Sequence, residues 1–391
     1  MTTVTRVGLW GVFGHGNYGN EATLTAFLNQ LDSVRFEPLI LTNNPHEASR
    51  LHGLPASSIG PPAYAAHGAA KLSQSISIAK NRASYLCGAL RRVRALDSVV
   101  IVGTGGLEHA GAFGTPFEIW SLGLACRTLR RPFVLLNIGV DRAHSRVTRM
   151  FVRESGRLAA YRSYRDERSR LNMVATGLHA GAGDPVVTDM ALSLEPPRAP
   201  VRDPRHVVVG VLDYDGVYGD DPSARDGYLR RCVRLVDGLC AEGYHVTIVA
   251  GDDDDVPTAQ CIATHFPSDA VTLSKAKTPH ELTVVMSEAS TVIAARYHTL
   301  IMGLLAGTPI VSIGYSEKHR HILRQFSLPE VHRDSSEFDP ADVVALVSES
   351  IAHQRHLSAR IEEGLARARR QLDRNWEDAL VTISRRSHTL G

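Results

Sequence analysis

Short apolar runs alternate with longer stretches of helical periodicity along most of the chain. The apolar runs end at a glycine or a polar turn, which is typical of buried parallel strands. The pattern predicts strands at residues 7–12, 36–41, 98–102, 133–138, 206–212, 245–250, 291–295 and 310–315. With helices between these strands, we expect an α/β fold that binds ligands at the carboxyl edges of its sheets.

A proline-rich stretch over residues 195–204, EPPRAPVRDP, is the clearest linker, because clustered prolines suit an extended connection. The chain has 391 residues, which is enough for two domains. We therefore predict an N-terminal domain over 1–195, a linker over 196–204, a C-terminal domain over 205–350 and a helical tail over 351–391.

The overall charge is balanced, with 43 Lys and Arg against 41 Asp and Glu. It offers no broad basic field, so we expect no nucleic-acid partner. The five cysteines are scattered and favour a reducing compartment. No run approaches 18 apolar residues and the N-terminus resembles a first strand, so we expect a cytoplasmic protein without stable membrane insertion.

Three groups able to carry positive charge follow two predicted strands. Arg296 and His298 come where the strand at 291–295 gives way to a helix, and Lys318 follows the next strand. Helix N-termini at such turns also favour anions. The cluster predicts a site for a phosphate or carboxylate. Taken singly, His298 could instead cap or pack a helix, and Arg296 could form an interdomain salt bridge.

A glycine-rich turn over residues 11–21 follows the first strand and opens a helix. Its N–H groups could cradle an anion, which makes Asn17 and Glu21 candidate binding residues; the alternative is a turn needed only for tight packing. The spacing does not match the dinucleotide motif G-x-G-x-x-G, so we expect no nicotinamide cofactor.

A second glycine turn, at residues 103–106, also follows a buried strand and contains Gly105 and Gly106. Glu108 and His109 come directly after it. At a sheet edge these two side chains could transfer protons or donate hydrogen bonds to a substrate, or they could be solvated loop residues.

Two charged segments are more ambiguous. Arg165 immediately precedes a predicted helix and would point toward a carboxyl edge, although such a charge run is usually a solvated helix start. The four aspartates at 252–255 could bind a metal. Because consecutive side chains point in different directions, we predict a solvated turn and no metal site.

In this order the motifs resemble the polysaccharide pyruvyl transferase family. The resemblance spans about residues 6–325 and rests on four segments, of which the last is the most specific: GNYGNE at 16–21, the glycine turn at 103–106, RDERS at 165–169 with Gly177 and Asp184-Pro185, and RYH at 296–298 with GTP at 307–309 and YSEK at 315–318.

The resemblance implies two Rossmann-like domains facing across a cleft, as in GT-B glycosyltransferases, with a C-terminal helical tail. It also implies an enzyme that transfers a pyruvyl group from phosphoenolpyruvate to sugar hydroxyls of a cell-surface polysaccharide or glycosylated metabolite and releases phosphate. Phosphoenolpyruvate is then a donor substrate, and no cofactor is expected. Arg165, Arg296 and Lys318 would hold its phosphate and carboxylate, and His298 would be a donor contact or general acid.

The chain departs from the family pattern on the acceptor side. Asn20 replaces a usual aspartate, Gly139-Val140-Asp141 replaces a usual Gly-Pro, and Glu108 and His109 stand where an aspartate is customary. The acceptor and the oligomeric state stay open, as does transient contact with a lipid-linked acceptor. The alternatives are a GT-B glycosyltransferase or nucleotide-sugar epimerase, and a non-catalytic binding homologue.

Overall fold

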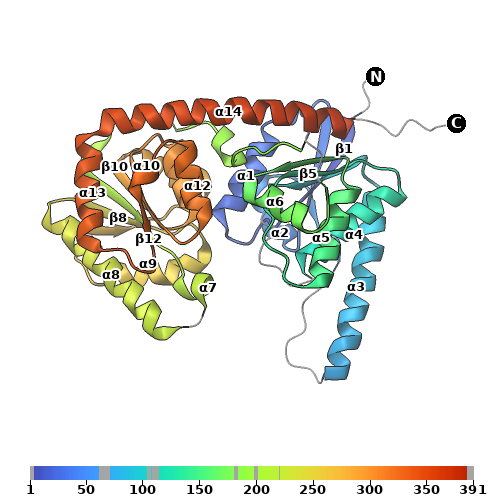
Figure 1. Cartoon of the computed structure of the whole chain (residues 1–391), viewed down its shortest axis with the longest axis horizontal. Helices are drawn as coiled ribbons and strands as arrows, with labels where there is room; N and C mark the ends of the chain where they lie inside the picture. Colours follow the sequence, from blue (N-terminus) through green and yellow to red (C-terminus); the bar gives the residue numbers. More distant parts are fainter. Residues whose placement is uncertain are drawn as a thin grey trace. The chain divides into compact units, whose positions relative to one another are not determined.

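The chain folds into two compact units, each built on its own parallel sheet (Figure 1). The computed structural model describes residues 4–60, 71–103, 107, 114–179, 184–197, 201–219 and 221–384, with side chains from residue 80 onward in the helix that begins at Lys71. The first unit comprises Met1–His15, Thr23–Met190 and Gln371–Gly391, and the second comprises Gly16–Ala22 and Ala191–Arg370.

The sheet of the first unit has six strands in the order β3-β2-β1-β4-β5-β6, all paired in parallel. Its strands are β1 (Thr5–Trp10), β2 (Phe36–Leu41), β3 (Ala56–Ser57), β4 (Ser98–Val102), β5 (Phe133–Ile138) and β6 (Tyr161–Tyr164). Its helices are α1 (Tyr18–Leu28, whose first residues count with the second unit), α2 (Pro45–His52), α3 (Lys71–Val93), α4 (Thr115–Thr128), α5 (Arg146–Leu158) and α6 (Glu167–Ala175).

The second sheet also has six parallel strands, in the order β12-β11-β10-β7-β8-β9. Its strands are β7 (Asp203–Gly210), β8 (His245–Val249), β9 (Val271–Leu273), β10 (Ala289–Ala294), β11 (Ile310–Gly314) and β12 (His332–Asp334). Its helices are α7 (Tyr214–Tyr218), α8 (Pro222–Ala241), α9 (Val256–Ala263), α10 (Pro279–Ser287), α11 (Tyr297–Leu305), α12 (Glu317–Gln325), α13 (Pro340–Ala352) and the start of α14 (Gln354–Ser384). Short 3₁₀ turns lie at Met190–Ser193, Asp253–Asp255 and Pro329–Val331.

Several strands are buried along their whole length because helices cover both faces of each sheet. Every residue of β4, β5, β10 and β11 is buried. Helix starts follow capping chemistry: Asp166 accepts a hydrogen bond from the N–H of Ser169 at 2.7 Å, and Thr278 accepts one from Glu281 at 3.2 Å. The predicted α/β class is confirmed.

The predicted division of the chain differs from the observed one in three places. The units separate at Met190 and Ala191, ahead of the linker placed at 196–204, of which residues 198–200 lie outside the described part. The segment Gly16–Ala22 counts with the second unit, and the tail placed at 351–391 is shared between the units.

Helix α14 explains the sharing of the tail, because its two halves bury different side chains. In its first half, Gly364 lies against the ring of Phe326 in the second unit. In its second half, Trp376 is 2% exposed and packs on Phe27 of the first unit, with ring centroids 5.6 Å apart. Each half of α14 therefore packs within the unit to which it is assigned.

Candidate functional site

The three predicted cationic residues lie at one edge of the second sheet. Arg296 occupies the N-cap position of α11 in an extended conformation, and His298 is in the first turn of that helix. Lys318 is in the first turn of α12. Strands β10 and β11 are parallel neighbours, with Ala294 paired to Ser312, so the two turns that follow them lie side by side. The structure thus places these residues on adjacent turns, with two helix N-termini.

Arg296 forms a buried ion pair that the sequence did not predict. Its Nε lies 2.9 Å and 3.0 Å from the two carboxylate oxygens of Asp255, and its Nη2 lies 2.5 Å from Oδ1. The Asp255 side chain is fully buried, and its Oδ1 also accepts a hydrogen bond from the N–H of Asp213 at 2.6 Å. Asp255, which lies in the turn after β8, therefore fixes the position of the Arg296 guanidinium.

The ion pair also sets the charge state of the edge. Burial lowers the pKa of Arg296, but the hydrogen bonds and charge of Asp255 outweigh burial and raise it above its ordinary value. The charge of Asp255 offsets that of Arg296, and Lys318 and the N-termini of α11 and α12 lie at the same edge.

His319 links the two turns to each other. Its ring is fully buried, with Nε2 3.1 Å from the carbonyl oxygen of Ala295 and Nδ1 3.0 Å from the hydroxyl of Ser316. Burial lowers the pKa of His319 to about 3, so the ring is neutral at ordinary pH. A carbonyl can only accept, so Nε2 carries the proton and Nδ1 accepts from Ser316. An added Cβ at Gly314 would lie 2.4 Å from this ring, so only glycine fits there.

The glycine turn at the start of α1 packs on this same edge of the second unit. Asn17 accepts a hydrogen bond from the N–H of Asn20 at 3.1 Å and donates one to Asp252 at 2.7 Å. Tyr18 donates to the carbonyl oxygen of Ala276 at 3.0 Å. Asn17 is thus the N-terminal cap of α1 and anchors the turn to the loop after β8.

Gly19 brings this turn against the candidate acid. A Cβ added there would lie 1.9 Å from Nδ1 of His298, so the absence of a side chain allows the close approach. Glu21, two residues on, is 5% exposed. The structure therefore brings Asn17 and His298 to one edge, and the predicted solvated turn at 252–255 is wrong for Asp252 and Asp255, since Asn17 and Arg296 bind them.

The remaining predicted site residues belong to the first unit. Arg165 follows β6, is 5% exposed, and donates its backbone N–H to the carbonyl oxygen of Ile138 at 3.2 Å. Its Nε lies 3.9 Å from a carboxylate oxygen of Asp166, which caps α6. It is a buried residue of a well-formed turn, and the solvated alternative is wrong. Gly105, Gly106, Glu108 and His109 lie outside the described residues.

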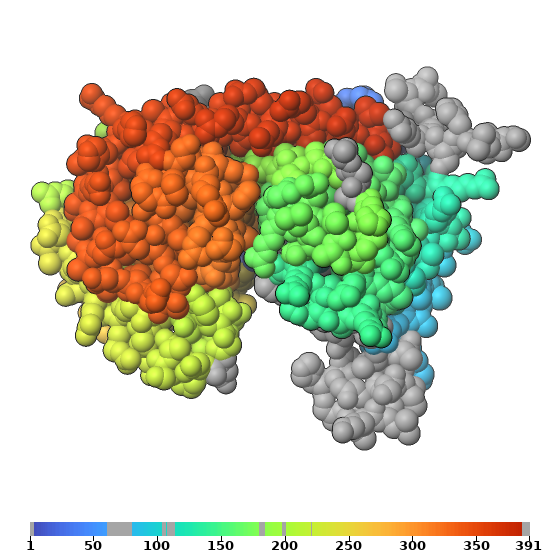
Figure 2. Space-filling model, in the orientation of Figure 1, coloured from blue at the N-terminus to red at the C-terminus, as the bar shows by residue number. Residues whose placement is uncertain are grey.

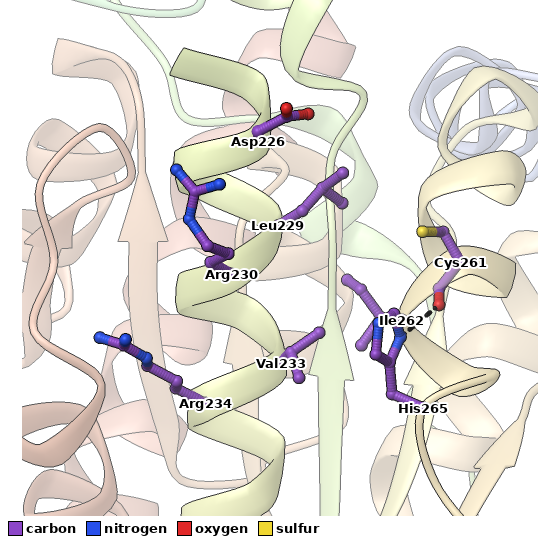
Figure 3. Close-up of a pocket in the computed structure, with 8 residues that line it drawn as sticks. All are labelled: Asp226, Leu229, Arg230, Val233, Arg234, Cys261, Ile262 and His265. Carbon is purple, nitrogen blue, oxygen red and sulfur yellow. Dashed lines mark hydrogen bonds between the residues drawn. The ribbon is translucent and has the colours of Figure 1, made fainter. Parts of the chain in front are cut away.

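A hollow of about 360 Å³ lies on the second unit between α8 and α9 (Figure 3). Its apolar floor is formed by Leu229, Val233 and Ile262, and His265 also lines it. In the close-up, Arg230 and Arg234 project away from Cys261 and His265. None of the residues lining this hollow is a predicted site residue, so it is separate from the cationic edge.

Two residues of the edge, Asp255 and His319, were missed from the sequence. Asp255 stands in a run of four aspartates, and nothing local singles it out. His319 stands in the charged sequence EKHRHILR, which is typical of an exposed helix start. The one local signal is Gly314, the last residue of the buried strand β11, because a glycine in a strand often marks the close approach of another group.

Comparison with solved structures defines the class of fold. Staphylococcus aureus MnaA in a co-structure with UDP matches with a TM-score of 0.59 and 9% identity, over 99% of this chain and 100% of that one. UDP-GlcNAc 2-epimerase from Neisseria meningitidis matches with a TM-score of 0.58 and 8% identity, over 95% and 99%. MurG from Acinetobacter baumannii matches with a TM-score of 0.54 and 14% identity, over 97% and 99%. The fold is that of the GT-B glycosyltransferases and epimerases.

The family model for polysaccharide pyruvyl transferase matches residues 17–317. The chain therefore belongs to the polysaccharide pyruvyl transferase family and is a transferase. A search of curated protein sequences gives no match. No helix in the described part of the chain is long and apolar enough to cross a membrane.

Proposed function

We propose that this transferase moves a pyruvyl group from phosphoenolpyruvate to a hydroxyl of a sugar and releases phosphate. The observation that carries the proposal is the placement of His298 and Lys318 on adjacent turns of one sheet edge, in a chain of this family. Phosphoenolpyruvate bears a phosphate and a carboxylate, and such groups bind helix N-termini and lysine.

The chemistry needs an acid beside the donor. A proton added to the methylene carbon of phosphoenolpyruvate leaves an electron-poor carbon at C2, to which the hydroxyl oxygen of the sugar bonds as it loses its proton. The bond from C2 to the phosphate oxygen then breaks, phosphate takes the electron pair, and C2 is left as an oxocarbenium ion bonded to the sugar oxygen. Either a second sugar hydroxyl bonds to C2 as it loses its proton and closes a ketal, or the methyl group loses a proton and an enolpyruvyl ether is left. We assign the acid to His298, whose ring lies in the first turn of α11 against Gly19.

The other roles follow from the contacts of each residue. Lys318 would bind the phosphate directly. Arg296 would hydrogen-bond to phosphoenolpyruvate through the N–H groups that Asp255 does not bind, and Asp255 would fix the orientation of the guanidinium. Asn17 would serve mainly to hold the turn that faces His298. Arg165 stays a prediction that rests on the resemblance of RDERS to the family motif.

The test is incubation of the protein with phosphoenolpyruvate and a panel of sugar acceptors, with measurement of released phosphate and of the mass gained by each acceptor. We expect His298→Ala to retain the fold and protection by phosphoenolpyruvate but to lose on the order of 100-fold or more in turnover. His321→Ala, a partly exposed histidine on the neighbouring α12, is the matched control and should keep turnover.

One alternative has an observation in its favour, because the structural neighbours include a UDP co-structure and an epimerase bound to UDP-GlcNAc. A nucleotide-sugar enzyme would be stabilised against heat by UDP-sugars and not by phosphoenolpyruvate. That outcome, or unchanged phosphate release by His298→Ala, would overturn the proposed function.

A further inference from the structure

Three neighbouring helices of the first unit form a layer that exposes large apolar side chains. Helices α3, α4 and α5 lie side by side, and their inner side chains join one core with the first sheet (Figure 1). Their outer side chains include Leu90, Leu124 and Met150, which are 41%, 36% and 40% exposed. Each comes from a different helix of the layer, so the apolar groups are distributed over its surface.

Helix α5 shows the pattern most clearly. Its buried residues Thr148, Phe151, Val152 and Ser155 lie on one side. At helical spacing, the opposite side places Met150 among four arginines, at 146, 149, 153 and 157. Val147 adjoins them and is 38% exposed. In Figure 2, α5 lies on the visible surface of the first unit, in the blue-green part of the scale. Exposure of the apolar Met150 side chain to water is unfavourable, and the arginines around it do not bury it.

The layer is also strongly basic in a chain whose total charge is balanced. Residues 80–93 of α3 carry four Lys and Arg, α4 carries one and α5 carries four. Two glutamates oppose these charges, and one of them, Glu118, is fully buried. The other, Glu154, pairs with Arg153 and Arg157 at 2.9 Å and 3.3 Å. The layer thus carries nine Lys and Arg against two Glu, whereas the whole chain has 43 against 41 Asp and Glu.

We propose that the outer surface of α3 (from residue 80 onward), α4 and α5 binds the surface of an anionic lipid bilayer. We call this surface the basic helix layer. Basic side chains attract anionic headgroups, and apolar side chains between them enter the boundary between headgroups and acyl chains. This mode needs no membrane-spanning helix, and the described part of the chain contains none.

The distribution of side chains favours a bilayer over the other polyanions. A nucleic-acid backbone would use the arginines but leave Leu90, Leu124 and Met150 without a role. A protein partner needs a contiguous apolar centre, whereas here arginines separate the apolar groups. A bilayer surface matches dispersed apolar groups among arginines, since each group inserts independently.

The test is binding of the whole protein to vesicles of phosphatidylcholine alone and of phosphatidylcholine mixed with phosphatidylglycerol, measured by flotation. We expect binding to the mixed vesicles only. The double variant Arg146→Ala/Arg149→Ala should weaken it roughly 30-fold, since each arginine near an anionic surface contributes about fivefold. Arg230→Ala/Arg234→Ala, which removes two exposed arginines from α8 in the second unit, is the matched control and should bind as the wild type does.

Two further measurements separate the bilayer from other polyanions. Met150→Ser should weaken vesicle binding several-fold at a salt concentration that screens the arginines, because the apolar contribution is not screened. Turnover with a soluble acceptor should be the same in all these variants, which keeps this proposal distinct from the assigned chemistry. Absence of binding to the mixed vesicles would overturn it, as would equal weakening by the α8 control. Tight DNA binding that is insensitive to Met150→Ser would assign the layer to nucleic acid instead.

Discussion

The two units can be compared strand for strand. In the first sheet β1 lies between β2 and β4, and in the second β7 lies between β8 and β10. If the strands of the second sheet are numbered from β7 as its first, the two sheets have the same strand order. The second unit holds an ion pair, a neutral histidine and a lysine at its carboxyl edge. In the first unit, α3 from residue 80 onward, α4 and α5 carry nine Lys and Arg against two Glu.

The proposed chemistry and the proposed membrane surface thus use different parts of the same architecture. Strand ends bring together groups far apart in sequence, such as Asp255 and Arg296, and bury them in a fixed geometry. Helix faces present groups close together in sequence, such as Arg146 and Met150, to solvent. We therefore expect substitutions to act on stability and turnover in the second unit, and on surface binding in the outer helices of the first.

The largest expected effect is that of Asp255→Asn. It leaves the Arg296 guanidinium buried without its counter-charge, and we expect a loss of about 3–5 kcal/mol in the unfolding free energy of the second unit. All three tryptophans, Trp10, Trp120 and Trp376, belong to the first unit. In denaturant, the variant should therefore lose helical circular dichroism well before its tryptophan fluorescence changes.

Asp254→Asn is the control for this prediction, because Asp254 is exposed in the same turn. It should leave both transitions where the wild type has them. If Asp255→Asn instead moves circular dichroism and fluorescence together, the two units unfold as one, and the comparison between them does not extend to stability.

The next largest effect should come from Gly19→Ala. The added Cβ would lie 1.9 Å from Nδ1 of His298, so the ring or the turn must move. A displacement of about 1 Å at a reacting group can cost on the order of 100-fold in rate, and we expect a loss of that size in phosphate release. Gly227→Ala on α8 is the control, since its Cβ would meet only the end of Arg231 at 3.5 Å. Full turnover by Gly19→Ala would contradict the placement of the acid at His298.

Much of this arrangement could be predicted from the sequence, because it depends on local patterns. The strands at 36–41, 98–102 and 133–138 were predicted with the observed bounds, since each is a short apolar run ended by a turn. The cationic edge was predicted because Arg296, His298 and Lys318 follow successive strands. Parallel pairing then brings such strand ends together.

The rest depends on contacts between distant segments. The pairing of Asp255 with Arg296 joins residues 41 positions apart, and three neighbouring aspartates hide the buried one. Helix α3 was missed because its sequence is rich in Ser and Ala and has few large apolar residues at helical spacing. The contact of Gly19 with His298 spans most of the chain, and no local property of a glycine indicates which side chain it faces.

The smallest expected effect is on the pH dependence of the unfolding free energy, and we expect it in the second unit. The pKa values of His206, His319 and His332 are lowered by burial, and all three residues belong to the second unit. The pKa of His319 is 6.5 in the unfolded chain and about 3 in the folded chain. At pH values between these two, the unfolded chain binds a proton at His319 that the folded chain does not. The unfolding free energy must therefore fall as pH is lowered through this range, by at most about 1.4 kcal/mol per pH unit for one ring.

His319→Gln removes this titration while an amide can still hydrogen-bond to Ser316 or Ala295. We expect the slope of unfolding free energy against pH, followed by circular dichroism between about pH 4 and 6, to become shallower by up to that amount. Some slope should persist because the pKa of His332, lowered to about 4, is unchanged. The exposed His356→Gln on α14 controls for loss of an imidazole. A slope that His319→Gln leaves intact would mean that the ring is already protonated in the folded chain. The two turns carrying Arg296 and Lys318 would then be held together by some contact other than the neutral His319.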